Sequence, residues 1–318
     1  MLRRENISRV RVKLDIEGIA RQAGMDLAGV APAQLPQEDV RFWRDWVSAG
    51  LHGEMKYLQN NMRADIRQWY PDAKCVIMTA LRYDRLPPAE ELLINTENSQ
   101  DKCVGKIARY VRKTDYHKAL KGRLAVMLSA IKKSEPSADG KIFVDTSPVL
   151  ERSYAKCAGL GWIGKNTMLI NKDIGSYFYL GGIALNTDLD IKGSGTRGVT
   201  TGCGTCSKCV DACPAKCLAS YEVDARQCVS YLTIEKKEDI PDACARGNAG
   251  SWIFGCDICQ DVCPFNKKNS MPSQHLELTG VFEWDRAKYR SVFKDTALSR
   301  ASWEKFQANA RIALENSK

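Results

Sequence analysis

The strongest indication of chemistry in this sequence is the spacing of its cysteines, which form two short runs. The first run, from Cys203 to Pro214, reads C-x2-C-x2-C-x3-C-P, and the second, from Cys256 to Pro264, reads C-x2-C-x3-C-P. The first spacing is that of bacterial ferredoxins, in which three thiolates hold one iron–sulfur cluster and the fourth cysteine crosses to another cluster. With Cys228 between the runs, the pattern predicts two 4Fe–4S clusters.

The ferredoxin crossing divides eight cysteines into two sets, with Cys228 in place of the member that the second run lacks. The predicted ligands of the first cluster are Cys203, Cys206, Cys209 and Cys263, and those of the second are Cys213, Cys228, Cys256 and Cys259. The remaining cysteines are expected to be small buried hydrophobic residues: Cys75, Cys103, Cys157, Cys217 and Cys244.

Structural zinc and a disulfide framework are the alternative interpretations of these cysteines. Zinc sites close with four ligands and usually combine two C-x2-C pairs, a pattern that the first run fits poorly. Disulfides are uncommon in a chain without an export signal. The N-terminus carries basic residues but no apolar segment of the kind that a signal peptide needs. We therefore expect a reducing, cytoplasmic location.

The overall composition is that of a soluble globular protein. Of the 318 residues, 44% are apolar and 27% are charged, which is typical of chains that bury a core. No apolar run approaches the ~18 residues that a membrane-spanning helix needs. We therefore expect no membrane association.

The net charge of +9 is concentrated in two stretches. Residues 102–133 contain ten Lys or Arg against one acid, and residues 286–318 contain eight against three. Clustered positive charge attracts a phosphate backbone, whereas isolated charge runs are more often the solvated faces of helices. The clustering favours nucleic-acid contact without establishing it.

Apolar periodicity predicts alternating helices and strands before the cysteine region. Helices are expected at 12–22, 37–49, 116–133, 284–293 and 301–314, with another from Pro148 to about residue 158. Strands are expected at 74–83, 141–145, 168–170 and 177–185. Residues 188–202 are rich in glycine and threonine and read as a linker. The expected order is an α/β domain at 1–190, a ferredoxin-like domain at 191–270 and a basic helical segment at 271–318.

Asp145 is the most suggestive side chain before the cysteine region. It ends a predicted strand, where α/β folds place reactive groups. A carboxylic acid that donates a proton near neutral pH must have its pKa raised by burial or by a neighbouring anion. Alternatively, Asp145, Thr146 and Ser147 precede the helix expected at Pro148 and could cap it. The residues alone leave both interpretations open.

The clusters imply that something else in the chain receives electrons. A ferredoxin needs only the cysteine region, so the preceding residues are expected to hold an active site with a second cofactor or a substrate. Two one-electron centres suit the delivery of two electrons to one redox centre.

Several strings of the sequence resemble the epoxyqueuosine reductase family, over roughly residues 10–315. They are DTSPVLER (145–152), AGLGWIGKNT (158–167), CGTCSKCVDACP (203–214), DARQCVSYLTIE (224–235) and GSWIFGCDICQDVCPFN (250–266). The resemblance implies an α+β protein in which a nitroreductase-like α/β cobalamin-binding domain precedes a ferredoxin-like domain with two 4Fe–4S clusters. It also implies reduction of epoxyqueuosine to queuosine at the wobble position of tRNA.

The same resemblance assigns roles to individual residues. Asp145 would be the proton donor, which favours catalysis over capping. The 115–117 triplet, Asp-Tyr-His, would lie in the wall of the active site. The cobalamin contacts that the resemblance implies are Arg63, Cys103, Asp145, Arg152, Leu169 and Leu180.

The resemblance also implies partners: tRNA with a GUN anticodon carrying epoxyqueuosine, and a low-potential donor of the flavodoxin or ferredoxin type. A monomer is expected. Many members append a helical-repeat domain that helps to hold tRNA. We expect it to be absent here, so that the two basic stretches carry more of the binding. Cys217 departs from the family pattern, which more often has a small residue at this position.

Two other functions remain as alternatives. A reductive dehalogenase-like cobalamin enzyme would use similar cofactors on a small organohalide, but it would not need the basic stretches. An electron carrier or RNA-binding adaptor without catalysis would have no need of cobalamin.

Overall fold

A four-stranded sheet organises the first part of the computed structural model, which describes residues 13–87, 104–111, 114–189, 202–241, 243–269 and 274–317. Its order is β1-β2-β7-β4, and each neighbouring pair is antiparallel. The strands are β1 (Leu27–Pro32), β2 (Cys75–Arg82), β7 (Phe178–Leu185) and β4 (Gly140–Phe143). The rule for the carboxyl ends of parallel strands therefore does not explain the position of Asp145.

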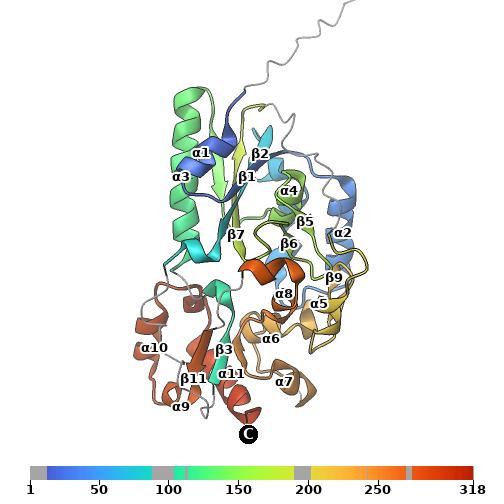
Figure 1. Ribbon diagram of the computed structural model, residues 1–318, viewed down its shortest axis with the longest axis vertical. Helices are drawn as coiled ribbons and strands as arrows, with labels where there is room; N and C mark the ends of the chain where they lie inside the picture. The colour runs from blue at the N-terminus through green and yellow to red at the C-terminus, as the bar shows by residue number, and fades with distance from the viewer. Residues whose placement is uncertain are drawn as a thin grey trace, which may run out of the picture.

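Helices cover both faces of this sheet (Figure 1). The side chains of β2 alternate between two cores, as a strand buried on both faces requires. Ile77 and Leu81 face one core, which also contains residues of α1 (Ile16–Gln22) and α3 (Tyr116–Ser134). Val76 and Met78 face the other core, against α4 (Glu151–Cys157), with α2 (Gln37–Ser48) beside it.

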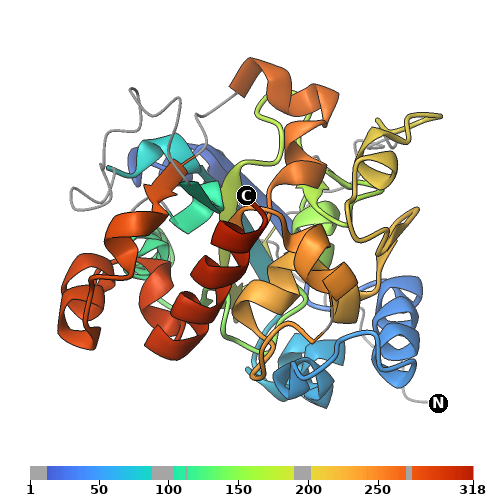
Figure 2. The ribbon, with the colours of Figure 1, turned by 90° about the horizontal axis from the view of Figure 1, so that it is seen from below.

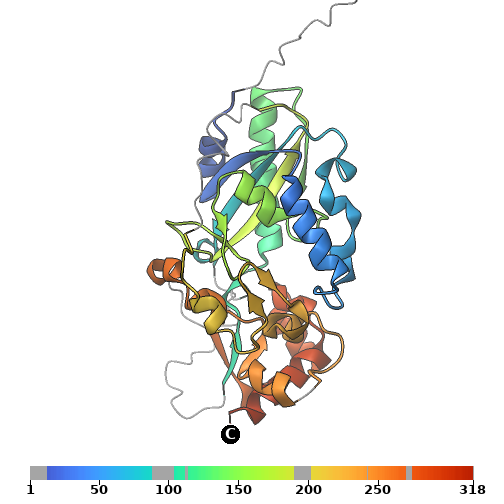
Figure 3. The same cartoon turned by 90° about the vertical axis from the view of Figure 1, so that its right-hand side faces the viewer.

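A second body lies below the sheet and contains the cysteine region (Figures 1 and 3). Its elements are short: α5 (Lys208–Asp211), β8 (Leu218–Ala219), β9 (Glu222–Val223), α6 (Val229–Ile234), α7 (Ala243–Ala249), β10 (Trp252–Phe254) and α8 (Ile258–Asp261). The hairpin of β5 (Trp162–Ile163) and β6 (Leu169–Ile170) reaches this region, because Trp162 and Ile170 pack with Cys263.

A three-stranded sheet joins distant parts of the chain in the lower body. Its order is β10-β3-β11, where β3 is Val104–Ile107 and β11 is Gln274–Glu277. The helices α9 (Leu278–Val281), α10 (Arg286–Phe293) and α11 (Trp303–Glu315) contribute to its core. Figure 2 shows α11 beside the elements of the cysteine region. The C-terminal segment is thus packed into the same body.

Short 3-10 helices complete the described structure: η1 (Lys56–Gln59), η2 (Asn61–Ala64), η3 (Ile66–Gln68), η4 (Tyr83–Arg85), η6 (Arg109–Val111), η7 (Ala225–Gln227), η8 (Pro264–Asn269) and η9 (Ala297–Arg300). Within the described ranges, no helix combines the length and the apolar composition needed to cross a membrane.

Most long elements agree with the sequence predictions within a few residues, including α2, α3, β2, β7, α10 and α11. The prediction for the Pro148 helix is wrong at its start: α4 begins at Glu151 after the N-cap residue Leu150. The strand expected to reach Asp145 ends at Phe143. The short strands β1, β3 and β11 were not predicted. Most of the expected linker, residues 190–201, lies outside the described residues.

Candidate active site and cysteine clusters

Asp145 lies in the turn between β4 and α4 with a left-handed backbone (φ 57°). Aspartate tolerates this conformation better than most residues, at some cost in strain. The Asp145 N–H donates a 2.7 Å hydrogen bond to Oε1 of Glu151, which holds the turn. The capping alternative is wrong, because no side chain hydrogen-bonds to the N-terminus of α4 and its N-cap is Leu150.

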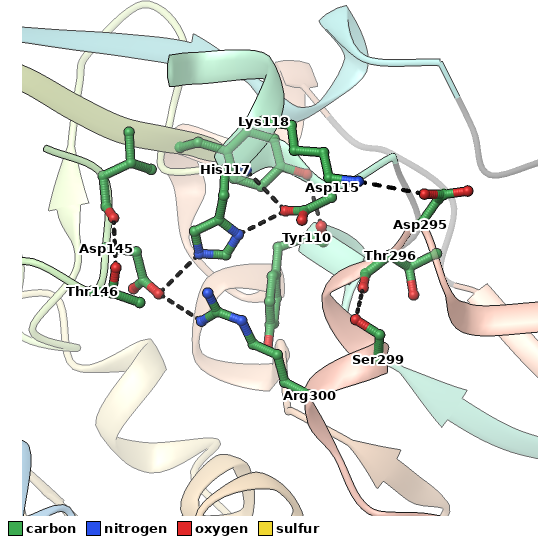
Figure 4. Close-up of polar contacts among 12 residues, drawn as sticks. Tyr110, Asp115, His117, Lys118, Asp145, Thr146, Asp295, Thr296, Ser299 and Arg300 are labelled. Atoms are coloured by element: carbon green, nitrogen blue, oxygen red, sulfur yellow. Dashed lines mark hydrogen bonds and ion pairs between the residues drawn. The ribbon is translucent and has the colours of Figure 1, made fainter. Parts of the chain in front are cut away.

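Two side chains meet the same oxygen of Asp145 (Figure 4). Nε2 of His117, from the start of α3, lies 3.1 Å from Oδ2, and Nη1 of Arg300, from η9, donates to Oδ2 at 3.0 Å. His117 is buried, whereas the Asp145 side chain is 45% exposed. The carboxylate is therefore anchored from two distant parts of the chain yet remains open to a ligand.

His117 connects Asp145 to a second carboxylate. Its Nδ1 lies 2.7 Å from Oδ1 of Asp115, the residue that also caps α3. Both ring nitrogens face carboxylate oxygens, and two alternative placements of the protons satisfy both hydrogen bonds. Either His117 is a cation between two carboxylates, or Asp145 carries the proton and donates it to a neutral imidazole. One mobile proton is thus shared between His117 and Asp145.

Tyr116 fixes the plane of the His117 ring. The two rings stack with centroids 3.9 Å apart, and Tyr116 also stacks on Tyr179 of β7 at 4.5 Å. The 115–117 triplet therefore lies against Asp145, where the resemblance expected it.

The pKa of Asp145 differs from the sequence expectation. Burial raises this pKa, but hydrogen bonding and charge from His117, together with Arg300, outweigh it and hold the pKa below its usual value. In this arrangement Asp145 is ionised at neutral pH.

Glu151 is the acid of the site that sequence reasoning missed. Burial raises its pKa to about 8, with the neighbouring charge of Asp145 as the next cause. Tyr57 and Glu235 lie close by, since the Tyr57 hydroxyl donates to Oε1 of Glu235 at 3.3 Å and Asp145 contributes to raising the pKa of both. Arg300 was also missed. Glu151 and Glu235 stand inside the strings that carried the resemblance, whereas Arg300 stands in none of them.

The two predicted cobalamin-contacting arginines lie near this site. Arg63 is buried, and its Nη1 donates to the Val149 carbonyl at 3.0 Å. Arg152 donates to the Thr167 carbonyl. The Arg152 side chain is exposed to solvent.

The other predicted cobalamin contacts are less accessible. Leu169 is 2% exposed and packs in the core on the α4 side, so a ligand would reach its backbone rather than its side chain. Leu180 of β7 is half-buried against the same core. Cys103 lies outside the described residues.

One pocket brings the first predicted cysteine set together. Its walls include Cys203, Cys206, Cys209 and Cys263, together with Lys165, Lys208, Ile170 and Phe265. The two lysines would offset the negative charge of a thiolate-bound cluster. The indole N–H of Trp162, which packs with Cys203 and Cys263, is buried without a partner among the described residues. A cluster sulfur is a fitting acceptor for it, so the donor set fits an iron–sulfur cluster.

The second predicted cysteine set also converges. Burial raises the pKa of Cys256 and of Cys259, and the nearby Cys228 adds to this increase. Cys213 packs with Cys228 and with a further thiol, Cys217. In the described part of the chain, no group of three or more His, Cys, Asp or Glu residues is arranged to hold a single metal ion.

Comparisons with known proteins agree with this geometry. A family model described as a 4Fe–4S double cluster binding domain matches residues 202–266, and the model for epoxyqueuosine reductase QueG matches residues 63–146. A relative named epoxyqueuosine reductase, from Cyclobacterium marinum, is 36% identical over 92% of this chain and 94% of its own length.

Two solved structures share the fold. The epoxyqueuosine reductase from Streptococcus thermophilus aligns with a TM-score of 0.83 at 30% identity, covering 97% of this chain and 82% of that one. An epoxyqueuosine reductase solved with an epoxyqueuosine-modified tRNA-Tyr stem loop aligns with a TM-score of 0.81 at 26% identity, covering 95% and 80%. The α+β fold with a double-cluster domain is thereby confirmed, and the chain belongs to the epoxyqueuosine reductase family.

Proposed function

We propose that this protein reduces epoxyqueuosine to queuosine at the wobble position of tRNA, using cobalamin and two 4Fe–4S clusters. The observation that carries the proposal is the proton-sharing group of Asp145, His117 and Arg300 in a chain with a double-cluster domain. Opening an epoxide reductively needs a proton donor and a source of electrons in one protein. The solved relative with a modified tRNA stem loop supports the choice of substrate.

The reaction balances as follows: two electrons and two protons convert the epoxide to an alkene and release its oxygen as water. Cobalamin, when bound, supplies a strongly reducing cobalt centre, which the clusters supply with electrons one at a time. The protein's own residues must bring the protons to the departing oxygen.

Asp145 delivers the first of these protons in our proposal. Among the described residues, the hydrogen bonds to its carboxylate all reach Oδ2, so Oδ1 can face a substrate. The proton comes from His117, whose second nitrogen faces Asp115. As the epoxide oxygen gains negative charge, the proton moves from the imidazole through Asp145 to that oxygen. His117 is then reprotonated from solvent by way of the exposed Asp145 side chain.

The residues that would hold the cofactors are those predicted from the sequence. Arg63, Cys103, Asp145, Arg152, Leu169 and Leu180 would surround cobalamin, and the position of Arg63 close to the charges of Glu151 and Asp145 supports this. Cys203, Cys206, Cys209 and Cys263 would hold one cluster, and Cys213, Cys228, Cys256 and Cys259 the other. The shared pocket of the first set and the close packing of the second support this division.

Exposed basic side chains support a tRNA substrate. Lys118 and Lys121 of α3 and Lys294 after α10 are exposed, as is Arg300. Two residues of the basic stretches serve inside the protein instead. Arg109 is buried against Asp257 and Asp261, and Lys305 is buried with its Nζ on the Glu238 carbonyl. The phosphate-binding surface is therefore smaller than the charge count suggests.

The proposal includes a cytoplasmic monomer that accepts electrons from a flavodoxin- or ferredoxin-type donor and acts on tRNA with a GUN anticodon. Reduced thiols suit that compartment, and an open Asp145 suits a macromolecular substrate.

The test uses anaerobically purified protein with added cobalamin. About eight irons and one corrin per chain, together with conversion of epoxyqueuosine-tRNA measured by nucleoside mass spectrometry, are expected. Eight irons without corrin binding would indicate an electron carrier instead. Corrin binding without conversion of the tRNA would overturn the proposal that epoxyqueuosine-tRNA is the substrate.

A further inference from the structure

Cys217 is a ninth thiol in the region of the two proposed clusters. It follows Cys213 by four residues and is 6% exposed. Its Sγ lies 3.5 Å from Sγ of Cys213. Both pack with Ala215, and Cys228 lies against the same small group. The eight ligands proposed above leave no iron for Cys217.

Cys213 and Cys217 cannot both bind irons of the same cluster in this arrangement. Thiolates on different irons are separated by two iron–sulfur bonds and the edge of the cube, which is well beyond contact distance. Two sulfur atoms 3.5 Å apart are instead at the distance of an S–H···S hydrogen bond. Because Cys213 is the cysteine that precedes proline in the ferredoxin spacing, Cys213 takes the iron and Cys217 keeps its proton.

A hydrogen bond to a cluster ligand changes the reduction potential of the cluster. Reduction adds negative charge that spreads onto the thiolate sulfurs, so a donor at one sulfur stabilises the reduced form more than the oxidised form. The backbone N–H groups of Ala215, Cys217 and Leu218 also reach the Cys213 sulfur. Any residue at position 217 would supply its backbone donor, whereas the thiol adds one more.

We propose that the Cys217 thiol donates a hydrogen bond to the Cys213 thiolate and thereby raises the reduction potential of the second cluster. This makes Cys217 a positioning residue for electron transfer rather than a ligand. The inference rests on the proposed cluster ligands, but it does not depend on the identity of the substrate.

The experiment compares wild-type protein with Cys217→Ala, Cys217→Ser and Cys157→Ala, each reconstituted anaerobically. Cys157 is a matched control, because it is a half-buried thiol that packs in the sheet core on the α4 side. Iron is counted, and a redox titration followed by electron paramagnetic resonance resolves the two potentials. We expect equal iron in all four proteins and a shift of the second potential to a more negative value in Cys217→Ala alone. Cys217→Ser keeps an O–H donor, so its second potential should stay close to the wild-type value.

Two results would overturn the inference. Unchanged potentials in Cys217→Ala would show that the thiol does not tune the cluster. A loss of iron in Cys217→Ala would show that Cys217 is itself a ligand. Failure of the proposed function is distinguishable, because wild-type protein would then lack clusters, or would hold both clusters with normal potentials and leave epoxyqueuosine-tRNA unconverted.

Discussion

At Asp145 an ionised carboxylate is met by an imidazole and a guanidinium, whereas the thiols of the cysteine region lie among apolar side chains. The partners at Asp145 hold its pKa low despite burial. Burial is the main cause that raises the pKa of the Cys209, Cys256 and Cys263 thiols. The first region already carries a charged carboxylate in the folded protein. The second gains its charge only when iron displaces the thiol protons, so cluster assembly and deprotonation are coupled there.

Removing one thiol should disrupt the cysteine region while leaving the Asp145 site intact. Cys228 is the proposed ligand that lies outside both runs. We expect Cys228→Ala to hold about four irons per chain instead of about eight and to lose turnover completely. Iron analysis and tRNA conversion measure this, with Cys157→Ala as the control that keeps both. Full iron content in Cys228→Ala would contradict the ligand assignment.

Substituting Asp145 should produce the opposite defect. Asp145→Asn cannot take up the shared proton, so turnover should fall by about 10²–10⁴-fold, the usual contribution of general acid–base catalysis. Iron content and corrin binding should remain at wild-type levels. Single-turnover conversion of modified tRNA measures the change. Asp139→Asn, at the other end of β4 beside Lys132, is the control that should keep full activity. Near-normal turnover in Asp145→Asn would remove the proposed proton donor.

Arg300→Ala should weaken catalysis more than stability. Both partners of the Arg300–Asp145 pair are about half exposed, so the loss of folding free energy should be at most about 1 kcal/mol. Turnover should fall by about tenfold, because the Asp145 turn loses one of its two side-chain anchors. Arg286→Ala removes a comparable surface pair with Glu304 and should leave turnover unchanged.

The pH profile separates positioning from general destabilisation in Arg300→Ala. Arg300 lowers the pKa of Asp145, so its removal should make the Asp145–His117 pair hold its proton to higher pH. Because a proton donor loses activity as pH rises through its pKa, the alkaline limb of the turnover profile should move to higher pH. A profile that keeps its position while activity falls would mean that Arg300 does not act through Asp145.

Glu151 gives the smallest expected effect, on stability. Its pKa of about 8 in the folded protein lies above the unfolded value of about 4.3, so the folded state binds more protons between these values and loses stability as pH rises through them. Glu151→Gln keeps an acceptor for the Asp145 N–H and removes this loss. The variant should match wild type near pH 5 and melt about 2–4 °C higher at pH 8.5, the shift that about 1 kcal/mol produces in large domains. Equal melting temperatures at both pH values would show that Glu151 is not held neutral.

Much of this protein was determined by local sequence. Iron–sulfur geometry dictates the spacing of ligands within a short run, so the cysteine spacing predicted two clusters, and a 4Fe–4S double cluster binding domain is confirmed at residues 202–266. The helices α2 and α3 follow from apolar residues at helical spacing, and β2 from a continuous apolar run. Asp145 was identified by its string, although the strand reasoning behind its position does not hold for an antiparallel sheet.

The rest was decided by the packing of distant segments. His117 lies 28 residues from Asp145, and Arg300 lies 155 residues from it; no spacing rule connects them. Their meeting depends on α3 crossing the sheet and on the C-terminal helices packing beside β3. The lowered pKa of Asp145 follows from that meeting. The raised pKa of Glu151 follows from its burial. Local patterns identify which residues can carry charge or protons, but desolvation and opposing charges are set only when the tertiary structure brings them together.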